Sequence, residues 1–143
     1  MLLSCGQAGQ TVFAGSFLRK REMILDSELL NDPVERARIL VHELFHFVWL
    51  RLGNPDRASW RALLEIELAG RARGELGWSS EWRKRGLPSG SMREYVCESF
   101  CDTAAFLYAA IGDHDEFTLA RRWREKRRAW FQATIGTRVV VRV

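Results

Sequence analysis

The sequence predicts a single α+β domain, mostly helical, with a small β-sheet at its N-terminal end. Three observations support this fold class. The chain has 143 residues, of which 47% are hydrophobic, so it suits one domain built on one core. Two short apolar runs precede residue 31, and four segments with helical periodicity follow it. We therefore expect one domain over residues 1–143, organised around a central helix.

The N-terminal segment has the composition of short β-strands. The runs TVFAGSFLR (11–19) and EMILDSELL (22–30) are rich in apolar, β-branched and aromatic residues, and charged residues separate them. They predict two short strands that pair as a hairpin. The final segment TRVVVRV (137–143) also predicts a strand.

The segment 31–53 predicts a long helix with clear start and stop signals. Asp32 suits the N-cap, Pro33 the first helical position, and Glu35 completes a capping box. Gly53 is a natural end. Because apolar residues occupy nearly every face of 39–50, this helix should run through the core.

Three further helices are expected. The segment 54–74 should begin with Asn54 as its cap, and 91–112 with a capping box from Ser91 to Glu94. The segment 115–136 predicts the last helix. Residues 78–90 predict a connector with one helical turn at most. The inward-facing residues are expected to be Trp60, Leu63, Leu64, Leu68, Phe100, Ala104, Ala105, Leu107, Tyr108, Leu119, Trp123 and Trp130.

Cysteine usage and hydropathy indicate a cytoplasmic protein. Cys5, Cys97 and Cys101 are an odd number, which fits a reducing compartment better than a disulfide framework. No uncharged run of 18 apolar residues predicts a membrane span, and the opening MLLSCGQAGQ lacks the features of a signal peptide.

The positive charge is concentrated in one helix. The formal net charge is +4, and ARRWREKRRAW (120–130) alone holds six Arg or Lys residues against one Glu. A solvated helix face is the simplest interpretation. A contact surface for nucleic acid or an acidic partner is the alternative, which we do not favour. Its residues would be Arg121, Arg122, Arg124, Arg127 and Arg128.

The motif H-E-x-x-H is the strongest functional signal. It occurs in ILVHELFHFVW (39–49), where His42 and His46 stand at i and i+4 on one helix face. Two imidazoles so placed can hold two corners of a Zn²⁺ tetrahedron, and Glu43 can act as general base towards a water on the metal. A pair of hydrogen-bonded core histidines without metal is the structural alternative.

A catalytic zinc needs a third protein ligand, and the third helix supplies the best candidate. In ESFCD, Glu98 stands one turn before Asp102. Glu98 can ligate the metal while Asp102 accepts the outer N–H of a ligand histidine and fixes its tautomer. Glu94 and His114 are alternative ligands.

These two motifs resemble the gluzincin pattern of zinc metallopeptidases. With the strand REMILD before ERARILVHELFHF, and a later helix containing ESFCDTAAFL, the chain is similar to the minimal ImmA/IrrE-type peptidase domain over residues 21–107. Two features differ: Phe45 replaces a common Gly, and the gap between the motifs is longer. The resemblance implies a zincin-like fold, Zn²⁺ held by His42, His46 and Glu98, and hydrolysis of an intracellular protein or peptide.

Two other functions remain open at this stage. One is a non-proteolytic metal-binding module with a regulatory role, although such a module has no need of a base at Glu43. The other is a nucleic-acid-associated protein that uses the basic helix. The sequence leaves the oligomeric state, the substrate and the oxyanion-stabilising residue open.

Overall fold

The computed structural model describes residues 2–7 and 10–138, and it confirms the α+β fold class with a mostly helical chain. An antiparallel sheet of order β1-β2-β3 lies at the N-terminal end, and the helices follow it. The strands are β1 (Leu2–Gln7), β2 (Gln10–Phe17) and β3 (Glu22–Leu25). The helices are α1 (Pro33–Arg51), α2 (Asn54–Ala69), α3 (Trp78–Arg85), α4 (Met92–Tyr108) and α5 (Arg121–Thr134).

The predicted hairpin is confirmed as the β2–β3 pair. Ala14 lies opposite Leu25, and Phe17 lies opposite Glu22. The second strand is shorter than predicted because the 3₁₀ helix η1 (Ser27–Asn31) follows it, with the Asp26 side chain accepting from the Glu28 amide. β1, which the sequence analysis did not predict, pairs with the other edge of β2. The strand predicted at 137–143 lies mostly outside the described residues.

The caps of α1 and α4 are confirmed, while other boundaries differ from the prediction. Asp32 accepts from the Glu35 amide at 3.1 Å, and Ser91 accepts from the Glu94 amide at 3.2 Å. The cap of α2 is Gly53, not Asn54, and no side chain caps it. α3 forms two turns where one at most was expected. α5 begins at Arg121, six residues later than predicted.

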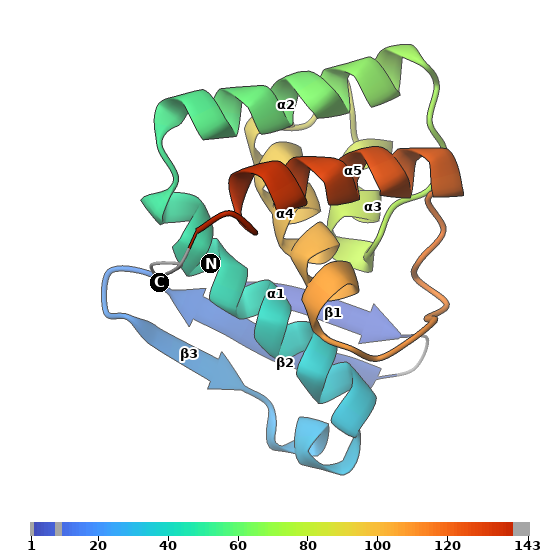
Figure 1. Ribbon diagram of the computed structural model, residues 1–143. Helices are drawn as coiled ribbons and strands as arrows, with labels where there is room; N and C mark the ends of the chain where they lie inside the picture. Colours follow the sequence, from blue (N-terminus) through green and yellow to red (C-terminus); the bar gives the residue numbers. More distant parts are fainter. Residues whose placement is uncertain (1, 8–9, 139–143) are drawn as a thin grey trace.

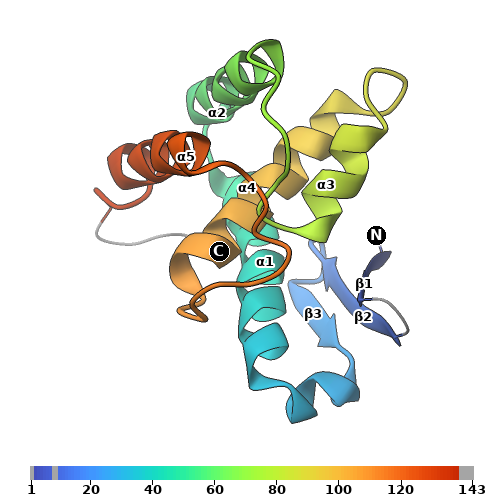
Figure 2. The same cartoon turned by 90° about the vertical axis from the view of Figure 1, so that its right-hand side faces the viewer.

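α1 lies between the sheet and the rest of the helices (Figures 1 and 2). One of its sides faces the sheet, and α4 crosses the other, so both sides of α1 are covered. α2 and α5 pack over α4 further from the sheet. This placement explains why two sides of α1 are apolar and buried, while Leu40, Leu44 and Leu50 remain exposed, and it puts the H-E-x-x-H residues at the junction of three elements.

The main core fills the space between α1, α2, α4 and α5. Trp60 from α2 is fully buried, and its ring packs edge-on against Phe100 and Phe131. The indole N–H of Trp60 donates to the Val96 carbonyl at 3.1 Å, so its polar atom is satisfied. The predicted core positions Leu64, Ala104, Leu119 and Trp123 are buried as well. This core fixes α4 relative to α1, and with it the spacing of the site.

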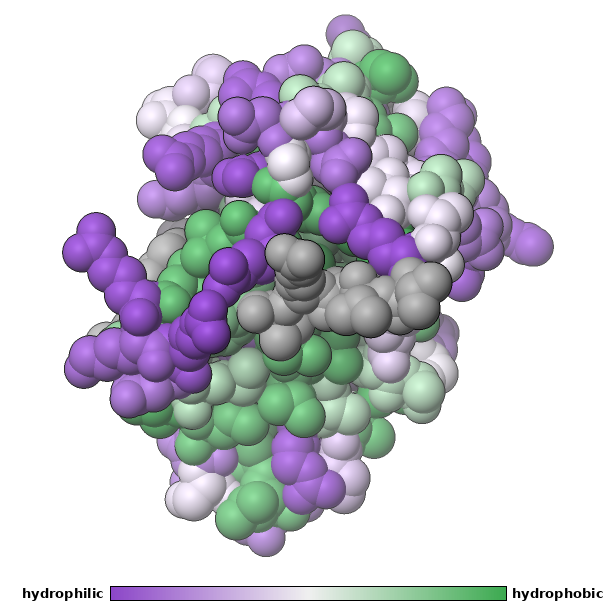
Figure 3. Space-filling model, turned by 60° about the vertical axis from the view of Figure 1, so that its left-hand side comes forward, coloured by the Kyte–Doolittle hydropathy of each residue, from purple (hydrophilic) through white to green (hydrophobic). Residues whose placement is uncertain are grey.

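The surface is unevenly divided. Hydrophilic side chains dominate the upper part of one face, whereas hydrophobic side chains gather lower down, where α1 and the sheet lie (Figure 3). Large apolar side chains that stay exposed there include Leu30, Val34, Leu40 and Leu44. Among the described residues, no helix is long and apolar enough to cross a membrane.

Candidate metal centre

Four side chains meet between α1 and α4, and all four are buried. His42 and His46 come from successive turns of α1, and Glu98 and Asp102 from successive turns of α4. Residues four apart on a helix project from the same side, so each helix contributes one row to the interface. The two rows face each other because the apolar core beside them holds the helices together.

Three of these side chains converge on one point. The Nε2 atoms of His42 and His46 are 3.2 Å apart. Glu98 Oε2 lies 3.1 Å from His42 Nε2, and Glu98 Oε1 lies 3.6 Å from His46 Nε2. Ligand atoms about 2.0–2.2 Å from a tetrahedral zinc lie roughly 3.4 Å from one another. The spacing of these donor atoms therefore fits one zinc ion.

The buried carboxylate of Glu98 has imidazole nitrogens as its nearest polar neighbours among the described residues. Neither of its oxygens makes a well-aligned hydrogen bond with a described residue, although both lie near imidazole nitrogens. Arg83 approaches Oε1 only to 3.8 Å. A buried carboxylate without partners is costly, and a bound cation would satisfy it. The donor set of two imidazoles and one carboxylate is one that zinc accepts.

Asp102 orients the first histidine. Its Oδ1 accepts from His42 Nδ1 at 2.7 Å, so that in the neutral imidazole Nε2 carries the lone pair and faces Glu98 and His46. The amide and hydroxyl of Ser80, in the first turn of α3, donate to Asp102 Oδ2 at 2.9 and 2.7 Å. Gly77 makes this approach feasible, because a Cβ there would lie 2.3 Å from the Asp102 carboxyl carbon. The predicted orienting role of Asp102 thus has the required geometry.

The electrostatics of the site couple these groups. Burial alone would lower the pKa of His42, but the charges of Asp102 and Glu98 raise that pKa well above its ordinary value. Burial would raise the pKa of Asp102, but His42 and the Ser80 hydrogen bonds lower it to about 2. Without a metal, the two carboxylates therefore favour the protonated form of His42. A metal cation would replace this proton.

Glu43 points towards the sheet. Its carboxylate is buried, and the Ser16 hydroxyl on β2 donates to its Oε2 at 2.5 Å. Among the described residues, nothing hydrogen-bonds its other oxygen, Oε1, which is therefore able to accept a proton. Ser16 was not among the predicted site residues. It shares a strand face with the buried Ala14, but this pattern does not reveal its partner Glu43, which lies 27 residues away in the sequence.

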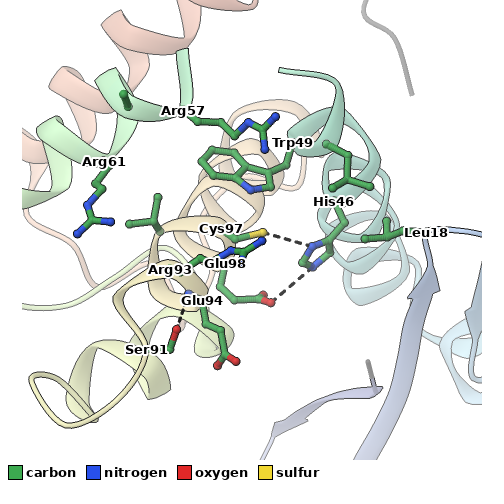
Figure 4. A pocket seen from close by; sticks show the side chains of 13 residues that line it. Leu18, His46, Trp49, Arg57, Arg61, Ser91, Arg93, Glu94, Cys97 and Glu98 are labelled. Atoms are coloured by element: carbon green, nitrogen blue, oxygen red, sulfur yellow. Dashed lines mark hydrogen bonds and ion pairs between the residues drawn. The ribbon is translucent and has the colours of Figure 1, made fainter. Parts of the chain in front are cut away.

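Beside the second histidine lies a pair of thiols. Cys97 Sγ is 3.7 Å from His46 Nδ1, whereas Glu98 approaches the other ring nitrogen, Nε2 (Figure 4). A hydrogen bond from Cys101 lowers the pKa of Cys97 to about 6; burial opposes this shift, and His46 assists it. Burial raises the pKa of Cys101 well above its ordinary value.

A groove of about 600 Å³ opens next to two of the three convergent side chains, His46 and Glu98. His46, Cys97 and Glu98 line its inner end, and Trp49 forms part of its wall (Figure 4). Its outer part carries cationic and apolar side chains, among them Arg57, Arg61, Arg93, Leu18 and Leu50. The groove gives a ligand as large as a short peptide access to the candidate centre.

The alternative ligands lie elsewhere. Glu94 is exposed on the rim of the groove, 3.7 Å from Arg83, and is not in the convergent group. His114 Nε2 lies 2.5 Å from Glu35 near the start of α1, so the structure does not bring it to the centre. Tyr95 on α4 is fully buried, and its hydroxyl donates to Glu75.

The basic helix differs from the prediction at one important position. Arg127 is fully buried, so its assignment to a contact surface is wrong. Its guanidinium pairs with Glu67 at 2.6 Å and Glu75 at 2.8 Å, both of which are also fully buried. Arg124 donates to the carbonyls of Phe117 and Leu119. Of the predicted surface, Arg121 and Arg122 are exposed and Arg128 is half-buried.

Comparison with known proteins adds no relative. No protein-family model matches the chain, and neither a curated protein nor a solved structure is significantly similar to it. The assignment of function therefore rests on the residues and geometry of the candidate centre.

Proposed function

We propose that the protein is a zinc-dependent peptidase, of the gluzincin type that the two motifs resemble. The observation that carries the proposal is the convergence of three buried donors, His42 Nε2, His46 Nε2 and the Glu98 carboxylate, within 4.8 Å of one another. Metal binding at this group is the part of the proposal that the geometry supports directly. The identity of the metal and the reaction are inferred from the donor chemistry and from Glu43.

In this proposal each residue of the centre has a separate role. Zinc held by His42, His46 and Glu98 would lower the pKa of a bound water to about 7 and polarise a carbonyl oxygen. Asp102 holds His42 in the tautomer that offers Nε2. Glu43 accepts a proton from the attacking water at Oε1 and delivers it to the leaving amine. The Ser16 hydroxyl stays on Oε2 and fixes the carboxylate during both transfers.

The groove supports a peptide substrate over a smaller one. Its volume of about 600 Å³ is in the range that accommodates several side chains, and it begins at His46 and Glu98. An extended substrate could also add to an exposed edge of the small sheet, which lies beside α1 (Figure 2). Both features support a substrate path that runs between the sheet and α4.

Two other functions receive less support. A purely metal-binding module does not need a carboxylic acid at Glu43 with a free acceptor oxygen. A nucleic-acid-binding role would depend on the basic helix, and the burial of Arg127 together with the carbonyl contacts of Arg124 removes two of its five predicted cations from that surface.

The test is proteolysis of a denatured protein or a mixed peptide library by the zinc-loaded full chain, with products identified by mass spectrometry. We expect cleavage that stops when the metal is chelated, returns with zinc, and falls at least about 100-fold in Glu43→Gln, the variant without the base. Glu125→Gln, on the exposed face of α5, is the matched control. Cleavage that survives in Glu43→Gln refutes the mechanism.

A further inference from the structure

α4 presents two neighbouring rows of metal-binding residues to α1. The first row, Glu98 and Asp102, contacts His42. The second row, Cys97 and Cys101, also has the i, i+4 spacing of one helix face and lies beside His46. The proposed peptidase mechanism uses the first row only. The second row consists of two thiols on the same histidine that the zinc centre requires.

We propose that His46, Cys97 and Cys101 form a second metal site, which takes a soft cation such as Cd²⁺ or Cu⁺ and competes with the zinc centre for His46. One ring nitrogen of His46 and the two Sγ atoms lie within 4.8 Å of one another. The Nδ1–Sγ distance to Cys97 is 3.7 Å. Sulfur and nitrogen ligands of one tetrahedral metal are about 3.5 Å apart, so the cluster needs only a small contraction.

The donor chemistry separates the two sites. Thiolates favour soft cations such as Cd²⁺ and Cu⁺ over zinc, although zinc accepts thiolates as well as the imidazole and carboxylate donors of the first row. Cys101 is fully buried and His46 is nearly so, which keeps competing water away from the sulfur atoms. Cys97 is half-buried and lines the groove, so a cation has an entry path from solvent.

The shared histidine makes the sites mutually exclusive. A neutral imidazole has one lone pair and one N–H, on different nitrogens. When Nε2 binds zinc with His42 and Glu98, the Nδ1–H of His46 faces Cys97. When Nδ1 binds a metal with the thiolates, the Nε2–H faces Glu98 instead. Figure 4 shows Cys97 and Glu98 facing the His46 ring from the same helix, one at each ring nitrogen. Soft-metal binding would therefore remove a ligand from the proposed catalytic centre.

The experiment is titration of the reduced, metal-free full chain with Cd²⁺, followed by the ultraviolet thiolate-to-cadmium charge-transfer band. We expect the band to saturate at about one Cd²⁺ per chain. It should be lost in Cys97→Ser and in Cys101→Ser, and retained in Cys5→Ser, which is the matched cysteine control. Circular dichroism and a thermal melt verify that each variant is folded.

Two further measurements separate this site from the proposed peptidase centre. In Glu98→Gln the band should persist, because the thiolate site does not use that carboxylate. In zinc-loaded wild-type protein, each Cd²⁺ that produces the charge-transfer band should displace one zinc ion. Cadmium that binds without the band, a band that survives in Cys97→Ser, or independent binding of zinc and cadmium overturns the proposal. None of these outcomes depends on whether the protein cleaves peptides.

Discussion

The buried guanidinium of Arg127 gives a prediction whose magnitude follows from its contacts. Its nitrogens make hydrogen bonds to Glu67 at 2.6–3.2 Å and to Glu75 at 2.8 and 3.1 Å. Among the described residues, Glu67 has no other hydrogen-bond donor, whereas Glu75 keeps Tyr95 and an ion pair with Lys84. Arg127→Met would therefore leave the Glu67 carboxylate buried without a partner.

Removal of one partner from a buried ion pair costs about 3–5 kcal/mol in the free energy of unfolding. For a chain of this size, such a loss lowers the melting temperature by roughly 10–15 °C. We expect Arg127→Met to fall in this range. The double variant Glu67→Met with Arg127→Met should recover at least about 1 kcal/mol over Arg127→Met alone, because it no longer buries an unpaired charge there.

Equilibrium unfolding in urea, followed by tryptophan fluorescence, measures these differences. Arg121→Met is the control, since Arg121 is exposed on the same helix and its replacement should change stability by less than about 0.5 kcal/mol. If Arg127→Met costs less than about 1 kcal/mol, or no more than Arg121→Met, then Arg127 does not hold the buried carboxylates and the described packing of α5 is wrong.

Three more predictions concern the orienting carboxylate, the core and the response to acid. Asp102→Ala should weaken zinc binding about 10–100-fold by calorimetry, because His42 loses the acceptor that fixes its tautomer; unchanged affinity would contradict this. Trp60→Ala should cost about 3–5 kcal/mol in urea unfolding, and a cost near zero would place the core elsewhere. Burial would raise the pKa of Glu75, but Arg127 and Lys84 lower it below its ordinary value. Stability from Glu75 is therefore present above its unfolded-state pKa and lost as the pH falls through the folded-state pKa. Glu75→Gln should flatten the decline in unfolding free energy between about pH 5 and pH 3; an identical decline in the variant would refute that account.

The features that the sequence predicted correctly depend on short-range rules. The start of α1 follows from Asp32 and Pro33, and the shared face of His42 and His46 follows from their spacing of four. The placement of Glu98 beside them was inferred from a second pair of residues with the same spacing. These inferences required only helix geometry and the chemistry of ligands, both of which are encoded within a few neighbouring residues.

The features that the sequence did not predict depend on distant contacts. The Ser16–Glu43 bond spans 27 residues, and Gly77 matters only because Asp102 happens to pack against it. Arg127 stands among charged residues, so composition indicated exposure. A signal was nevertheless present, because Arg127 lies four residues from both Trp123 and Phe131, on the stripe of α5 that is buried. A charged residue in such a stripe should have suggested a buried partner.

The measurement that tests the central claim most directly is zinc binding by the purified full chain after removal of metal and reconstitution, quantified by plasma mass spectrometry. Wild type and the control Glu125→Gln should each hold about one zinc per chain, and Glu98→Gln should hold little. Zinc retained by Glu98→Gln would contradict the proposed centre and would indicate that His46 and the two cysteines hold the metal. Absence of zinc from the wild-type protein would leave His42 and His46 as core histidines paired with acids.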